Sequence, residues 1–203
     1  MLTPREKRHQ RTQDAILEAA RDIIVQKGPD KLSMRALARR IDYSPAGLYE
    51  YFGSKEEIVT AVCEQGHGRL YNEMARVDTA LPAQEYLLEI GLAYIHFAVT
   101  NPDYFLLMFT QTQSNITENN FAELTSEGSS FSILLTAVTR LAEEGIVAVN
   151  ENYSVLSVAY SAWSVVHGLA MLRVTFLRDV NMVSFEVADR ETLRALSLGL
   201  ALL

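Results

Sequence analysis

The sequence predicts an all-α protein with an N-terminal three-helix helix-turn-helix domain, residues 1–53, and a C-terminal helical domain, residues 54–203. Three observations lead to this prediction. Apolar residues recur at the spacing of amphipathic helices along most of the chain, and no strand pattern competes with them. Two short helix patterns joined by a four-residue turn lie between residues 32 and 55. The chain has only five Pro and ten Gly, too few for a turn-rich β-sandwich.

The first helix is expected to begin at Thr3, since a capping Thr, Pro4 at the first position and Glu6 at the third form a start signal. An apolar face then runs from residue 16 to residue 24, and Lys27-Gly28 ends the helix. Four basic residues crowd its start. These residues, Arg5, Lys7, Arg8 and Arg11, belong either to a flexible arm that touches phosphates or to a solvated first turn.

The next two helices are short and are joined by a tight turn. Ser33 is placed to cap the first of them, and Ser44 with Pro45 starts the second. Asp42 tolerates the left-handed backbone that such a turn often requires. The second helix then carries small residues on its outer face. A helix of this kind can press its backbone into a DNA major groove, so residues 32–55 read as a helix-turn-helix.

The charge distribution favours the same end of the chain. Residues 1–55 carry 11 Lys/Arg against 7 Asp/Glu, whereas residues 56–203 carry 7 against 18. A basic end on an acidic body, within a net charge of −7, is typical of a protein that holds a polyanion at one end. A chance distribution of solvated charges is the plainer alternative.

The C-terminal domain reads as helices throughout. Helices are expected from Pro82, from Asn101-Pro102, which caps the helix that follows, from 131 to 144, from Asn150 or Asn152 to about 178, and from 189 to the end. Residues 111–130 are polar and are expected to form either a mobile loop or a short, poorly packed helix. Segment 153–177 is apolar nearly all round, and segment 189–203 is rich in Leu. One internal core cannot easily cover both, so we expect a homodimer through 153–177 and 189–203. Gly66-His67-Gly68 is either a hinge or a place of close backbone packing.

Several classes of protein are not expected. The single Cys63 excludes an internal disulfide framework, the N-terminus does not resemble a secretory signal, and no run of 18 uninterrupted apolar residues occurs. A cytoplasmic protein without membrane attachment is therefore predicted. The sequence has no GxSxG, HExxH or Gly-rich phosphate motif, and its four histidines lack ligand spacing. Neither an enzyme nor a metal or other cofactor is expected.

Two sets of motifs resemble a known family. Over about 65 residues, LSMRALARRI followed by YSPAGLYEYFGSKEEI resembles the DNA-binding domain of the TetR family of repressors. AWSVVHGLAML, with YIHFAVTNPDYFLLMF upstream, resembles a subclass whose C-terminal domain is marked by Trp, His and Gly. The second resemblance is more diffuse than the first.

The resemblance implies roles for particular residues at the DNA. Ser33 and Arg35 would meet phosphate and a base edge, and Tyr51 and Lys55 would anchor phosphates. The reading surface would consist of Ser44, Pro45, Ala46, Gly47 and Tyr49. Asp42 replaces the Gly usual at the turn. Glu50 departs from the pattern on the reading helix, where it accepts from a cytosine amine, turns toward Arg39 or Arg40, or is merely tolerated.

The resemblance also implies an effector pocket in the C-terminal domain. Its aromatic walls and few polar points would suit a small, largely apolar ligand. The plainer alternative is that these side chains are ordinary core. The candidates are Tyr94, Phe97, Tyr104, Phe105, Met108, Phe109, Trp163, His167 and Met171.

The function expected from all of this is transcriptional regulation. The resemblance implies a dimer that binds double-stranded DNA at a palindromic operator, represses by occlusion and is released by a small effector. The alternative is a helical carrier of apolar small molecules without specific DNA recognition. The basic N-terminal block favours the regulator, because a carrier has no need for it.

Overall fold

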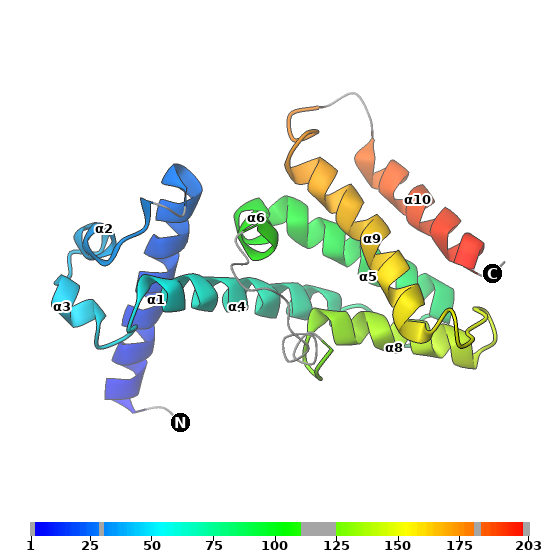
Figure 1. The fold of residues 1–203 in the computed structure, drawn as a ribbon, viewed down its shortest axis with the longest axis horizontal. Helices are drawn as coiled ribbons and strands as arrows, with labels where there is room; N and C mark the ends of the chain where they lie inside the picture. Colours follow the sequence, from blue (N-terminus) through cyan, green and yellow to red (C-terminus); the bar gives the residue numbers. More distant parts are fainter. Residues whose placement is uncertain (1–2, 29–30, 111–124, 181–183, 201–203) are drawn as a thin grey trace. The chain divides into compact units, whose positions relative to one another are not determined.

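The computed structural model describes residues 3–28, 31–110, 125–180 and 184–200. Apart from one isolated bridge between Asn150 and Tyr153, the regular elements in these residues are all helices, which confirms the all-α prediction (Figure 1). The chain divides into two compact units, Met1–Gly66 with Leu106–Thr112, and His67–Phe105 with Gln113–Leu203. The division falls inside a helix, within the Gly66-His67-Gly68 segment, whereas the sequence placed the domain boundary at 53/54.

The first unit contains α1 (Pro4–Lys27), α2 (Met34–Arg40), α3 (Pro45–Leu48) and the start of α4 (Lys55–Met74). The predicted capping box at Thr3 is present, and Gly28 ends α1 with a φ of 83°. The α1 face packs on α2, which in turn packs on α3. Fully buried apolar side chains form the core of this unit, including Ile16, Leu37, Leu48 and Ile58.

The turn between α2 and α3 has the predicted backbone. Asp42 adopts a φ of 54°, and the Tyr43 amide donates to the Ala38 carbonyl at 2.8 Å. Ser44 then caps α3, because its Oγ accepts from the Gly47 amide at 2.9 Å. Local chemistry therefore fixes where α3 begins, and with it the direction of the surface that α3 presents.

The segment Ser54-Lys55-Glu56-Glu57 at the start of α4 has the sequence of a capping box, but its hydrogen bonds differ slightly from that pattern. Ser54 accepts from the Glu57 amide at 3.1 Å, as expected. The Glu57 carboxylate accepts from the amide of Gly53 rather than from that of Ser54. Further along, α4 runs unbroken through Gly66-His67-Gly68. A Cβ on Gly68 would meet nothing within 4 Å, so close packing is not the reason for that glycine.

The second unit is built on α5 (Ala83–Thr100), which packs against α8 (Ser130–Glu143), α9 (Val155–Val174) and α10 (Phe185–Leu200) (Figure 1). The close approach of α10 to α5 depends on Gly91, where a Cβ would lie 3.0 Å from Leu193 Cδ1. Arg173 on α9 also donates to Asp189, which is buried on α10. These contacts set the positions of the helices that carry the effector-site candidates.

Two helix boundaries in this unit differ from the prediction. The long helix begins at Val155, because Ser154 rather than Asn150 or Asn152 caps it, and it ends at Val174 instead of about residue 178. The last helix begins at Phe185, four residues before the predicted start at Asp189. Most of the predicted loop at 111–130 lies outside the described residues, as do residues 201–203. Residues 130 and beyond already belong to α8.

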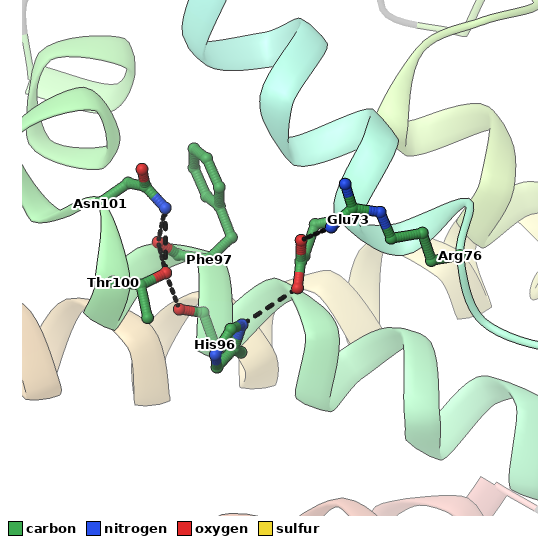
Figure 2. Close-up of polar contacts among 6 residues, drawn as sticks. All are labelled: Glu73, Arg76, His96, Phe97, Thr100 and Asn101. Carbon is green, nitrogen blue, oxygen red and sulfur yellow. Dashed lines mark hydrogen bonds and ion pairs between the residues drawn. The ribbon is translucent and has the colours of Figure 1, made fainter.

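A polar cluster ties the end of α4 to α5 (Figure 2). Glu73 accepts from Arg76 at 3.0 Å and pairs with Nδ1 of His96 at 3.1 Å. At the end of α5, Asn101 donates through Nδ2 to Phe97 O and to Thr100 Oγ1. The Asn101 side chain therefore contacts the end of α5, while the Asn101 carbonyl accepts from the Phe105 amide at 3.0 Å at the start of the next helix, α6 (Pro102–Thr110).

Helix α9 buries only one of its sides in this chain. By length and composition alone it could cross a membrane, a test that core helices of soluble proteins also pass. Residues at successive four-residue intervals along α9 form an exposed stripe, which consists of Leu156, Tyr160, Ser164, Gly168 and Leu172 and is continued beyond the end of the helix by Phe176. On α10, Val187 and Leu198 are also exposed. Four large hydrophobic side chains exposed along one stripe are unusual for a surface that faces only water.

Candidate DNA-binding surface and effector site

Helix α3 presents the outer surface that the sequence predicted. Ser44, Pro45 and Ala46 are exposed, while Leu48 at the other side of the same turn is fully buried. Tyr49 follows with 56% of its surface exposed. This arrangement leaves backbone and small side chains outermost, so a DNA groove can approach closely.

Gly47 has a second reason to lack a side chain. A Cβ at this position would lie 2.7 Å from Cε1 of Tyr43 and 3.0 Å from Oγ of Ser44. The Tyr43 ring, 41% exposed, therefore covers Gly47. Sequence reasoning anticipated close approach of DNA here, but not this internal contact.

The two serines of the predicted surface are helix caps. Ser33 Oγ accepts from the Ala36 amide at 3.1 Å, as Ser44 Oγ does from Gly47. A serine hydroxyl can accept and donate at once, so this capping leaves each hydroxyl its hydrogen for a phosphate oxygen. Both residues are exposed. The capping geometry is thus compatible with the predicted phosphate contacts.

The remaining DNA candidates lie on the flanks of α3. Arg35 is exposed on α2, and Lys55 is half-buried at the first position of α4. Tyr51 is half-buried, stacks on His9 with ring centroids 4.6 Å apart and meets Tyr43 edge-on. The amides at the start of α4 and the Lys55 ammonium would both favour a phosphate oxygen there.

Glu50 is exposed next to this surface. Of its two candidate partners, Arg40 is engaged elsewhere, because it donates to Asp22 at 2.9 Å. Arg21 joins the same carboxylate, and the two arginines lower the pKa of Asp22. The charge of Glu50 contributes to a raised pKa of Tyr43, behind the larger effect of the neighbouring Tyr51 phenol. Glu50 therefore adds negative charge near the reading surface.

Four of the nine effector candidates form one contiguous cluster in the second unit. The Tyr94 hydroxyl lies 2.8 Å from Nδ1 of His167, and Trp163 Nε1 donates to the same hydroxyl at 3.3 Å. Phe105 contacts both Tyr94 and His167 through its ring. Three helices, α5, α6 and α9, thus bring a polar chain and aromatic walls together.

Phe131 on α8 belongs to this cluster and was not predicted. Its ring meets that of Trp163 edge-on, with centroids 5.7 Å apart. In the sequence, Phe131 could be recognised only as part of the apolar face of α8, which also buries Leu134, Val138 and Leu141. That stripe identifies a core face, but it does not identify Trp163 as the neighbour.

The other five effector candidates lie on α5, α6 and α9. Phe97 and Tyr104 are buried, and the Arg69 guanidinium lies 4.7 Å over the Tyr104 ring. Met171 is half-buried one turn after His167. Met108 and Phe109 are buried and half-buried, in the part of α6 that belongs to the first unit. A ligand-lining role for these five residues stays a prediction.

The cluster is electrically neutral. Burial lowers the pKa of His167, which favours the neutral imidazole, and burial raises the pKa of Tyr94 far above its ordinary value. Among the described residues, no group of three or more His, Cys, Asp or Glu is placed to hold a metal ion. A neutral aromatic site with a few oriented polar groups suits an uncharged ligand better than an ion.

Comparison with known proteins bears on both sites. Residues 16–62 match the family model described as bacterial regulatory proteins, tetR family, and residues 87–190 match the model described as tetracyclin repressor-like, C-terminal domain. The second match alone spans half of the chain. The chain belongs to the TetR family. This is a family of DNA-binding transcriptional regulators and not of enzymes, and membership in the Trp-His-Gly subclass stays a prediction.

Individual relatives of this TetR-family chain are consistent with the family assignment. It is 28% identical over 107 residues to an uncharacterized HTH-type transcriptional regulator, YobS of Bacillus subtilis, covering 53% of this chain and 56% of the relative. It thus spans about half the length of the curated relatives it matches. A Rhodococcus protein of unknown function shares the fold with a TM-score of 0.76 and 22% identity, covering 93% of this chain and 95% of the other.

A second similar structure carries a ligand. It is a TetR variant from Acinetobacter baumannii in complex with minocycline, with a TM-score of 0.60 and 20% identity, covering 91% of this chain and 93% of that one. At this identity the likeness concerns the fold alone. The TetR fold therefore extends over most of this chain.

Proposed function

We propose that this chain is a homodimeric, cytoplasmic transcriptional regulator that represses by occluding a palindromic operator and is released by a small, largely apolar ligand. The observation that carries the proposal is the surface of α3. This helix is capped at Ser44, buries Leu48 and turns Pro45 and Ala46 outward. Family membership and the basic N-terminal block support DNA as the partner of that surface.

Specificity on this surface would depend little on side-chain hydrogen bonds. Pro45, Ala46 and Gly47 offer apolar contacts, so thymine methyl groups and DNA shape would select the operator. Ser33, Arg35, Tyr51 and Lys55 would fix the register through phosphates, which carry no sequence information directly. Ser44 and Tyr49 complete the proposed reading surface.

Dimerisation through α9 and α10 would explain their exposed apolar stripe. Tyr160 and Phe176 are 64% and 84% exposed in the single chain, and a second copy would cover them. A two-fold axis would also place two α3 helices on one DNA duplex. Half-sites separated by one helical turn, about 34 Å, are the usual consequence, and they make the operator a palindrome.

DNA binding is tested with labelled fragments of the promoter regions beside the protein's own gene, measured by mobility shift and fluorescence anisotropy. We expect one fragment to bind at least about 1,000-fold more tightly than competitor DNA, with two protomers per site and strong salt dependence. Transcription from that promoter in vitro should fall when the protein is added. Absence of salt-sensitive binding to any of these fragments would contradict the proposal.

The effector site is proposed at the cluster of Tyr94, Phe105, Trp163 and His167, with Phe131 as a further wall. Trp163 is the only tryptophan in the chain, so its fluorescence reports directly on this site. Neutral aromatic molecules should quench it in a saturable manner and release the operator fragment at the same concentrations. A compound that releases DNA while leaving Trp163 fluorescence unchanged would place the effector site elsewhere.

A further inference from the structure

The start of α1 makes an aromatic contact with the helix-turn-helix, and neither the proposed DNA contacts nor the proposed effector site accounts for it. The imidazole of His9 stacks on the ring of Tyr51, with centroids 4.6 Å apart and planes 21° from parallel. Tyr51 in turn meets Tyr43 edge-on at 6.2 Å, and the nearby Tyr51 phenol raises the pKa of Tyr43. The three rings join α1, the turn before α3 and the segment after it.

We propose that His9 is a positioning residue for DNA binding, which holds the Tyr51 ring and thereby aims its hydroxyl at the DNA backbone. This inference rests on the phosphate role proposed for Tyr51. Tyr51 follows α3 in a segment that is outside any helix, where its side chain would otherwise sample several rotamers. A stacked ring has already lost that freedom before DNA arrives, so less entropy is lost on binding.

The position of His9 favours this role over a purely structural one. The whole first part of α1, including His9, is exposed, whereas the core of the first unit lies further along the helix at Ile16 and Ala20. Removing an exposed ring from this place removes little buried apolar surface. The stack therefore contributes little to the core, but it connects α1 directly to the DNA-facing segment.

The ring of His9, rather than its charge, should be what matters. Arg5, Lys7, Arg8 and Arg11 already supply positive charge on the same part of α1. His9→Phe keeps a stacking ring and removes any charge, whereas His9→Ala removes both. Gln10→Ala is the matched control, because Gln10 is the exposed neighbour and its side chain donates only to Asp14 in the next turn.

The test measures the affinity of each variant for the operator fragment by fluorescence anisotropy, alongside thermal unfolding. His9→Ala should weaken binding roughly 2- to 10-fold with little change in Tm, while His9→Phe and Gln10→Ala should stay within about twofold of the original protein. If His9→Phe binds as weakly as His9→Ala, the positioning role is wrong. His9→Gln replaces His9→Ala should the latter unfold.

A double-mutant cycle with Tyr51→Leu then decides whether His9 acts through Tyr51. In the Tyr51→Leu background, His9→Ala should cause no further loss of affinity. Additive losses would overturn the inference and leave the proposed function standing. Unchanged affinity of Tyr51→Leu alone would remove both the phosphate role of Tyr51 and the inference, whereas failure of the original protein to bind any fragment would contradict the proposed function itself.

Discussion

The hydroxyl of Tyr94 lies 2.8 Å from Nδ1 of His167, and this contact joins α5 to α9 inside an aromatic surround. The indole of Trp163 can only donate, so Tyr94 must accept from it. If the Tyr94 hydrogen points to Nδ1, a neutral His167 carries its own hydrogen on Nε2. Protonation of His167 would place a hydrogen on both nitrogens and oppose this arrangement.

The first prediction concerns the pH dependence of stability. Because burial lowers the pKa of His167 below its ordinary 6.5, the unfolded chain binds more protons than the folded protein in that range. Stability is therefore complete above about pH 6.5 and falls as the pH drops toward the folded-state pKa. His167→Gln removes this contribution but can still accept from Tyr94.

The measurement is Tm between pH 7.5 and pH 5.5 for both proteins. We expect a larger decrease in the original protein than in His167→Gln. The comparison between the two proteins is needed because burial also lowers the pKa of His67. His67 therefore contributes to the loss of stability at low pH in both proteins. If Tm depended on pH equally in the two proteins, folding would not favour the neutral form of His167.

The second prediction concerns Tyr94→Phe, which removes the hydroxyl shared by Trp163 and His167. The free energy of unfolding should fall by about 1–3 kcal/mol, the usual cost of removing one partner from buried polar groups. Tyr86→Phe is the control, since Tyr86 is a buried tyrosine on the same helix. Urea unfolding measures both variants. A loss no larger than that of Tyr86→Phe would mean that the network contributes little to stability.

Sequence reasoning was most successful where local chemistry decides the structure. The caps at Thr3, Ser33, Ser44 and Ser54 and the left-handed backbone at Asp42 are all present, because each depends on residues within one turn. These signals placed the start of each N-terminal helix. The exposed surface of α3 followed from them, since the cap and the buried Leu48 fix which side of α3 is outermost.

Long-range packing was harder to predict. The contact of Phe131 with Trp163 joins residues of different helices, and the cover of Gly47 by Tyr43 depends on the shape of a turn. Helix starts without a strong signal were also misplaced, as at Val155, where several Asn and Ser residues offered competing caps. Periodicity identifies a buried face, but it does not say which neighbour covers it.

The third prediction separates phosphate contacts from base reading. Lys55→Ala should weaken binding to all DNA sequences alike and reduce the slope of log K against log salt by about one unit. Tyr51→Phe should also weaken binding uniformly, with the slope unchanged, because the phenol carries no charge. Lys27→Ala, at the exposed end of α1, is the control lysine. A change in sequence preference alone would contradict the phosphate assignment.

The fourth prediction concerns Gly47→Ala. The new Cβ would meet the Tyr43 ring at 2.7 Å and the capping hydroxyl of Ser44 at 3.0 Å, so the ring must move. Because Tyr43 also contacts Tyr51, operator affinity should fall about tenfold or more, while far-UV circular dichroism stays nearly unchanged. Tyr43→Ala removes the obstruction, so Gly47→Ala should cost less in that background. An equal cost in both backgrounds would show that the Tyr43 contact is not the reason for Gly47.

The last prediction uses Gly168, which lies in the middle of the exposed stripe of α9. A Cβ there would meet nothing within 4 Å in the single chain, so Gly168→Leu should not disturb the fold of the protomer. Leu is also a better helix former than Gly, by up to about 1 kcal/mol. If α9 packs against its copy in a partner subunit, however, a bulky side chain at this point would force the two helices apart.

Sedimentation velocity should therefore show that Gly168→Leu weakens dimerisation by about tenfold or more while the Tm of the diluted protomer holds or rises. Gly68→Leu is the matched control, because Gly68 is likewise an exposed helical glycine with open space around it, but on α4. It should leave the dimer intact. If Gly168→Leu remained fully dimeric, the two-fold contact would have to lie away from this stripe. The exposed Tyr160 and Phe176 would then not be buried by the partner subunit at this contact.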